Sequence, residues 1–85
     1  MSNYVARKKN LEDGNTLRQE TWTTDSSLGG KRMYNVDLVS GHFVHRFPTD
    51  YLVALREEEV NNIYDSIRSR ADFERIIAEQ KARRE

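Results

Sequence analysis

The sequence predicts an α+β fold, in which a small antiparallel sheet of about two to three strands packs against an amphipathic helix that is followed by a second helical segment. Three observations support this fold class. Residues 32–47 alternate like a β-hairpin, residues 50–68 carry an apolar stripe at helical spacing, and residues 69–72 form a second helix-start signal. With 85 residues, the chain is expected to form one small domain.

The segment before this domain, residues 1–15, is polar and charged, and we interpret it as a flexible N-terminal arm. The domain itself is expected to span residues 16–85. Asp13-Gly14 is a turn signal within the arm. Residues 25–31 (DSSLGGK) are predicted to be a loop, and their Gly-Gly-Lys lacks the spacing of a phosphate-binding loop.

Residues 16–24 (TLRQETWTT) are rich in threonine, which is typical of a strand at the edge of a sheet. The face that contains Leu17 and Gln19 and the face that contains Arg18 and Glu20 are both too polar for a central strand. Trp22, the only tryptophan, has two interpretations. It either covers one side of the core or serves as a binding anchor, because tryptophan is frequent among interface hot spots.

The central hairpin, residues 32–47, is placed by Ser40-Gly41, because glycine adopts the positive φ that a tight two-residue turn requires. With these two residues as the loop, Leu38 faces Phe43. Side chains alternate between the faces of a strand, so one face collects the apolar positions of both strands: Tyr34, Val36, Leu38, Phe43, His45 and Phe47.

Pro48 disfavours helical geometry in the residue before it and should end the hairpin. Thr49 or Asp50 can then cap a helix that runs to about Arg68. In the alternative, residues 51–55 form another strand and the three glutamates from residue 57 open the helix. The predicted buried set is Trp22, Tyr34, Val36, Leu38, Phe43, Phe47, Leu52, Leu55, Val60, Ile63 and Ile67.

A second helix is predicted from about Asp72 to the C-terminus, because Ser69 and Asp72 have the spacing of a capping box. On a continuous helix, Phe73, Ile76 and Ile77 would point away from the first apolar stripe. The cations at residues 81–84 suit the negative end of the helix. The alternative is a docking helix that places this second apolar stripe in a partner's groove.

Several chemistries are excluded or disfavoured by composition. The absence of cysteine removes disulfides, thiolate metal sites and cysteine nucleophiles. His42 and His45 fall on opposite faces of the hairpin, and no metal-binding or nucleophile motif is present. We therefore expect no enzyme activity, no metal and no cofactor; a site at His42, Asp37 and Arg46 ranks last. Without a membrane span or signal peptide, a soluble, cytoplasmic protein is expected.

The leading hypothesis is a non-enzymatic module that binds another protein or a second copy of itself, as an accessory or inhibitory protein that occupies a surface. The expected contact residues are Trp22, Phe73, Ile76, Ile77, Arg83 and Arg84. The alternative is a nucleic-acid-binding regulator, although the zero net charge disfavours it. Its basic patch would contain Arg7, Lys8, Lys9, Lys31, Arg32 and Arg46.

Overall fold

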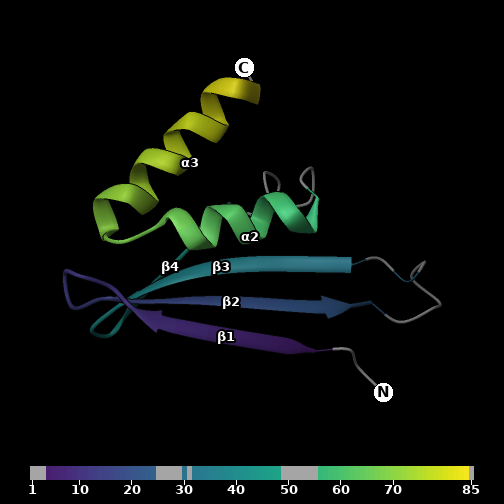
Figure 1. Cartoon of the computed structure of the whole chain (residues 1–85), viewed down its shortest axis with the longest axis horizontal. Coiled ribbons are helices and arrows are strands. Elements are labelled where there is room, and N and C mark those ends of the chain that lie inside the picture. The colour runs from purple at the N-terminus through teal and green to yellow at the C-terminus, as the bar shows by residue number, and fades with distance from the viewer. Residues whose placement is uncertain (1–3, 25–29, 31, 49–55, 85) are drawn as a thin grey trace.

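The structure is a computed structural model that describes residues 4–24, 30, 32–48 and 56–84. Its elements in chain order are β1 (Val5–Asn10), β2 (Thr16–Thr23), β3 (Arg32–Ser40), β4 (Phe43–Arg46), α2 (Glu57–Ser66) and α3 (Arg70–Arg84). The strands form one antiparallel sheet in the order β1-β2-β3-β4, and both helices lie on the same side of it (Figure 1). The predicted α+β class with an antiparallel sheet is confirmed.

Strand β1 lies within residues 1–15, the segment that was expected to be a flexible arm. It pairs with β2 from Val5, opposite Thr21, to Asn10, opposite Thr16. The charged composition suggested an arm because it lacks a local apolar pattern. Ladder hydrogen bonds to β2 hold this segment in the sheet without such a pattern.

The turn between β1 and β2 forms at the predicted Asp13-Gly14 signal. Gly14 has a φ of +85°, and the Asn15 N–H donates to Asp13 Oδ1 at 3.1 Å. Leu11 is buried in the core, so an apolar side chain anchors the turn at its first residue.

Strand β2 lies between β1 and β3 and is therefore central, whereas we expected an edge strand. Its side chains alternate as predicted, with Leu17, Gln19 and Thr21 buried on the helix side of the sheet. A polar residue is tolerated at the centre because the amide of Gln19 is hydrogen-bonded at both ends, to Arg7 and to Asn61.

The β3–β4 hairpin turns one residue later than predicted. Ser40 pairs with Phe43, which was expected opposite Leu38, and the loop is Gly41-His42. Gly41 has a φ of +58° and His42 does not have a positive φ, the sign pattern of a type II′ turn. The register shift is two residues, so every side chain of β4 stays on its predicted face.

Phe43 was predicted to be buried but is 70% exposed. The shifted register moves it from opposite Leu38 to the end of the hairpin, opposite Ser40. At that position it extends beyond the apolar residues of β3. Phe47 remains fully buried, and its N–H donates to the Val36 carbonyl at 2.8 Å.

Helix α2 begins at Glu57, the start that the alternative reading of the sequence gave, and residues 49–55 lie outside the described residues. Arg56 is the N-cap and makes no side-chain capping bond. Three glutamates in the first turn instead face the positive end of the helix dipole. Val60, Ile63 and Tyr64 are the residues that α2 buries against the sheet.

The predicted break between the helices lies at residues 67–69, and α3 begins at Arg70. The Asp72 N–H donates to Ser69 Oγ at 3.5 Å, and Asp72 Oδ2 accepts the Arg68 N–H at 2.9 Å. The β1–β2 turn supports the same joint, because Asp13 Oδ2 accepts the Arg70 N–H at 2.7 Å.

The first half of α3 packs on the core, whereas its second half projects away from the sheet (Figure 1). Phe73 is only 2% exposed and meets Phe47 edge-on, with ring centroids 6.0 Å apart. Ile76 is also buried, and Ile77 packs partly against the same cluster. The apolar stripe that we expected to be available to a partner is therefore mostly core.

The remaining burial predictions divide as follows. Seven residues are confirmed as core: Tyr34, Val36, Leu38, Phe47, Val60, Ile63 and Ile67. Trp22 is only half-buried, and Leu52 and Leu55 lie outside the described residues. The core also contains five residues that the prediction omitted: Leu11, Leu17, Tyr64, Phe73 and Ile76.

Candidate functional site

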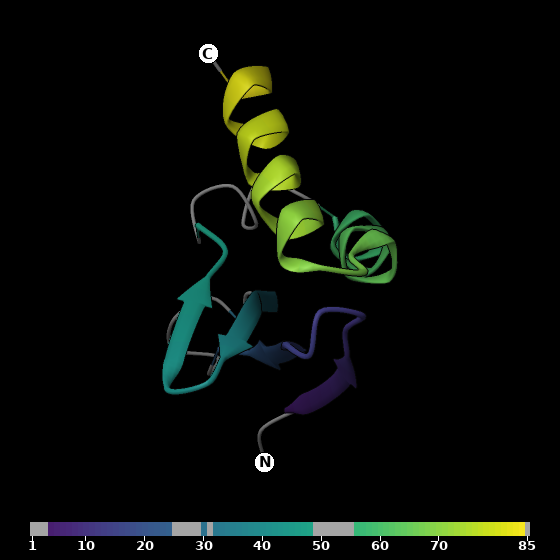
Figure 2. The same cartoon turned by 90° about the vertical axis from the view of Figure 1, so that its left-hand side faces the viewer.

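The outer edge of β4 is the first part of the candidate site. β4 pairs only with β3, and no strand among the described residues pairs with its other side. Because the Phe47 N–H bonds to β3, the alternation of an antiparallel ladder directs the backbone groups of Val44 and Arg46 outward. In Figure 2, β4 lies at the side of the sheet away from α2.

This edge also carries exposed apolar side chains. Phe43 is 70% exposed and Val44 is 54% exposed. The Phe43 ring stacks near His45, with centroids 6.4 Å apart and planes at 27°. Single exposed apolar residues are ordinary, but two in succession on an unpaired strand edge are typical of a surface that binds another chain.

A groove of about 430 Å³ lies beside this edge, between β4 and α3. Its apolar lining on the helix side of the sheet comes from Leu38 and from Phe73 and Ile77 in the first half of α3, and the edge residue Val44 also borders it. The polar lining is Arg46, Arg70, Glu74 and His45. Arg70 Nε donates to Glu74 Oε1 at 3.1 Å, so one rim of the groove is an exposed ion pair on α3.

The opposite edge of the sheet has a different character. β1 carries three consecutive cations, Arg7, Lys8 and Lys9, and charged side chains on an edge oppose pairing with another strand. β4 has one cation, Arg46, whose guanidinium is bound to Asp37. Both described edges carry exposed apolar residues, Tyr4 and Val5 at β1 and Phe43 and Val44 on β4, but β4 is the less protected by charge.

Asp37 holds Arg46 on the sheet face opposite the helices. Arg46 donates through Nε to Asp37 Oδ1 at 2.9 Å and through Nη2 to Oδ2 at 3.0 Å, while Arg18 Nη2 donates to Oδ2 at 2.8 Å. Burial raises the pKa of Asp37, but the hydrogen bonds and charges of the two arginines outweigh burial and hold this pKa below its ordinary value. The side chain is therefore a charged structural anchor.

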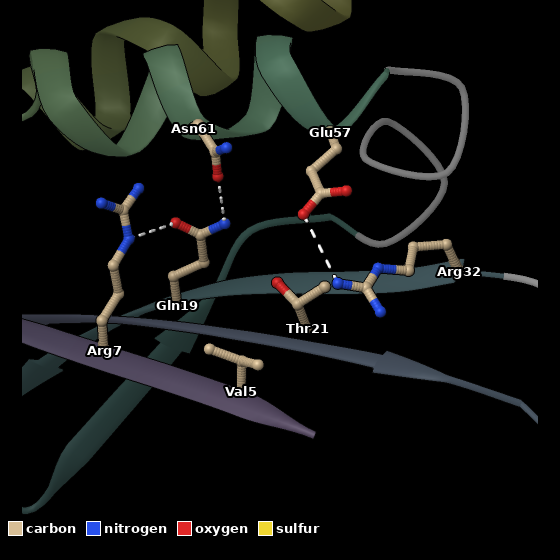
Figure 3. Close-up of a pocket in the computed structure, with 7 residues that line it drawn as sticks. All are labelled: Val5, Arg7, Gln19, Thr21, Arg32, Glu57 and Asn61. Carbon is tan, nitrogen blue, oxygen red and sulfur yellow. Dashed lines mark hydrogen bonds and ion pairs between the residues drawn. The ribbon is translucent and has the colours of Figure 1, made fainter. Parts of the chain in front are cut away.

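Figure 3 shows a smaller pocket, of about 240 Å³, where α2 meets β1 and β2. Arg7 Nε donates to Gln19 Oε1 at 2.9 Å, and Gln19 Nε2 donates to Asn61 Oδ1 at 2.9 Å. At the other end, Arg32 Nη2 lies 3.5 Å from Glu57 Oε1. Both arginines of this pocket are thus engaged by residues of the fold.

The basic residues considered for nucleic-acid binding do not share one face. Arg7 and Lys9 point to the helix side, where the Arg7 guanidinium lies 4.0 Å from the centroid of the Tyr64 ring and Lys9 Nζ donates to the Tyr64 carbonyl at 2.8 Å. Lys8, between them on the strand, lies on the other face.

Arg32 and Arg46 were expected to be neighbours at the open end of the hairpin, but β4 pairs with the other half of β3. Arg46 lies opposite Asp37, five residues along the strand from Arg32, a separation of about 16 Å. Lys31, which was expected beside Arg32 and near Arg46, lies outside the described residues.

The residues expected to bind a protein partner are likewise distributed over several surfaces. Phe73 and Ile77 line the groove beside β4, whereas Ile76 is buried on the side of α2. Trp22 lies on the sheet face opposite the helices. Arg83 is exposed near the end of α3, and the side chain of Arg84 lies outside the described residues.

A metal site, a membrane-spanning helix and the site at His42, Asp37 and Arg46 have little support in the described part of the structure. Among the described residues, no three His, Cys, Asp or Glu side chains are grouped so that they could hold a metal ion. The described helices include none that is long and apolar enough to cross a membrane. Asp37 and Arg46 are neighbours as expected, but they are engaged with each other, and His42 lies in the hairpin turn.

Comparisons with protein-family models, curated proteins and solved structures found no match to this chain. The candidate site therefore depends on the geometry described above. Sequence reasoning missed the exposure of Phe43 because it placed this residue in the core. The signal that could have identified this exposure is the shortness of the second strand before Pro48, which limits how far the hairpin pairs.

Proposed function

We propose that this chain is a non-enzymatic protein-interaction module that binds an extended segment of protein along β4. The observation that supports this proposal is the coincidence of an unpaired strand edge with a groove beside it that is partly lined by apolar residues. A bound strand would add to the sheet through backbone hydrogen bonds, the mode known as β-augmentation.

In this proposal each part of the site has a role. The outward N–H and C=O groups of Val44 and Arg46 form the ladder to the bound segment. Alternate side chains of that segment then enter the groove, against Phe73 and Ile77, and the others lie beside Val44 on the opposite face. Backbone bonds supply general affinity, and the groove supplies preference for apolar side chains.

Val44→Pro tests the proposal directly. Proline removes the outward N–H of residue 44 without removing a bond to β3, and proline is tolerated on edge strands whose N–H faces solvent. Val44→Thr is the matched control because it keeps both the N–H and the β-branched shape. Peptides selected from a random displayed library against the wild-type protein serve as the probe.

We expect the selected peptides to bind Val44→Pro at least about tenfold more weakly, a loss of about 1.4 kcal/mol, and to bind Val44→Thr as tightly as the wild type. Hydrogen exchange should show protection of the Val44 and Arg46 amides when a peptide is bound. Equal binding by Val44→Pro, with protection elsewhere on the molecule, would contradict the proposal. Circular dichroism confirms that each variant is folded.

A further inference from the structure

We infer that the segment that occupies β4 in solutions of this protein alone is β4 of a second copy, so that two sheets join edge to edge about a twofold axis. This inference rests on the proposed function, because it uses the same edge and groove. It goes further than the proposed function in two ways. It identifies the bound segment as β4 of a second copy of this chain, and it assigns the register in which the two β4 strands pair.

The other described edge is less suited to the same pairing because of its basic run. In an antiparallel pairing of two β1 strands, every register centred within the basic run places like charges opposite each other. In each of them a residue of the run Arg7, Lys8 and Lys9 meets itself or its neighbour in the run of the second copy. Like charges directly opposite on a sheet are destabilising, so self-pairing is disfavoured at β1.

At β4 we assign a register without that penalty, centred on the outward-facing Val44. Val44 of one copy lies opposite Val44 of the other, and Phe43 lies opposite His45 of the second copy. Arg46 does not face a second arginine in this register. The contact is isologous, as a twofold axis requires, because each residue and its counterpart exchange the same contacts.

The exposed ring of Phe43 has a place in this arrangement. His45 lines the groove beneath α3, together with Phe73 and Ile77. A Phe43 ring held opposite His45 of the second copy therefore lies at that copy's groove. The association removes from water the most exposed of the large apolar side chains in the described part of the chain, and it places this ring at the groove that Phe73 and Ile77 help to line.

The short strand limits the strength of this pairing. β4 has four residues, so the ladder is brief and the association belongs to the weak, concentration-dependent class of interfaces. Small domains without disulfides often gain stability from association of this kind. A peptide or protein that binds β4 more tightly would displace the second copy, which links the inference to the proposed function.

Sedimentation equilibrium over roughly a hundredfold range of concentration measures the association. The wild type should shift from 10.0 kDa toward twice that mass as concentration rises. Phe43→Asp should abolish the shift. Val5→Asp, at an exposed apolar residue of the other edge, is the matched control and should leave the shift unchanged.

The register is tested by cross-linking, which is simple here because the chain has no cysteine. Val44→Cys should give a covalent dimer under oxidising conditions, since residues directly opposite in a ladder lie within the Cα separation of a disulfide. Val5→Cys should cross-link only at the rate of random collision. Equal cross-linking by both variants would overturn the assigned register.

The results distinguish this inference from the proposed function. A wild type that stays at 10.0 kDa throughout, while selected peptides still protect the Val44 and Arg46 amides, would overturn the inference alone. A mass shift that survives Phe43→Asp would also overturn it. Failure of peptides to select for β4, together with a mass shift that Phe43→Asp abolishes, would support the inference and restrict the edge to self-association.

Discussion

Replacing Asp37 with asparagine should be among the most destabilising single polar changes in this protein. The carboxylate is fully buried and accepts three short hydrogen bonds from Arg46 and Arg18. Asparagine keeps the size of the side chain but removes its charge and leaves an NH₂ group facing a guanidinium. The change therefore breaks a buried ion pair without creating a cavity.

The size of the expected loss in unfolding free energy depends on how well water can hydrate Arg18 and Arg46 once the carboxylate is gone. Removing one partner of a fully buried pair costs about 3–5 kcal/mol. The side chains of Arg18 and Arg46 are 39% and 54% exposed, so water can reach them once the carboxylate is gone. We therefore expect the lower end of that range, about 3 kcal/mol, or a Tm lower by about 12–24 °C for a domain of this size.

The assay is urea unfolding followed by circular dichroism, with Asp65→Asn as the matched control. Asp65 is a 63% exposed aspartate that also pairs with an arginine, Arg7, at 3.5 Å. Exposed pairs contribute about 0–1 kcal/mol, so this variant should unfold almost as the wild type does. If Asp37→Asn were also within about 0.5 kcal/mol of the wild type, the account of Asp37 as a charged anchor would be refuted.

The same experiment has a pH dependence with a defined sign. The pKa of Asp37 is lower in the folded protein than in the unfolded chain. Its contribution to stability is therefore fully present above the unfolded pKa, about 3.9, and is lost as the pH falls through the folded pKa. The difference in unfolding free energy between wild type and Asp37→Asn should be constant near neutral pH and shrink below about pH 4.

Three further variants test other parts of the fold. Phe73→Ala should cost about 3–5 kcal/mol by urea unfolding, whereas Arg83→Ala on the same helix should stay within about 0.5 kcal/mol; a mild effect of Phe73→Ala would mean that α3 does not pack on the core. Gly41→Ala should cost about 1–2 kcal/mol, because its methyl group meets no neighbour and only the positive φ is strained; an unchanged unfolding midpoint would contradict the assigned turn. Asp13→Ala should speed amide exchange at Arg70, and unchanged exchange there would show that the long-range cap is not formed.

The sequence predicted the side-chain faces of the hairpin more reliably than its register. Alternation has a period of two, so a two-residue shift conserves every face and changes only which residues stand at the tip. Phe43 is the residue that this shift moves out of the core, and with Val44 it supplies the exposed part of the candidate site. Serine and glycine mark the turn in the sequence. The choice between Ser40-Gly41 and Gly41-His42 as the loop depends on which register of β3 against β4 gives the better side-chain packing.

Two other differences between the predicted and the observed fold, at α3 and at β1, have a long-range cause. The sequence predicted a break before a second helix, but it did not predict the direction in which α3 leaves that break. The extended backbone at Ile67 changes the direction of the chain, so a stripe that would point elsewhere on one helix returns to the core on two. β1 was missed because its stability comes from pairing with β2, which a local charge pattern does not encode.

The contact between the β1–β2 turn and the start of α3 has a consequence for synthesis. Asp13 and Arg70 are 57 residues apart, and at about 5–20 residues per second the ribosome needs roughly 3–11 s to make the intervening chain. An isolated two-stranded hairpin is at best marginally stable in water, so β1 and β2 have no settled structure until at least β3 has been made. A nascent chain arrested before Arg70 would therefore lack both the helix and the cap that completes its first hairpin, and would be an early substrate for chaperones and proteases.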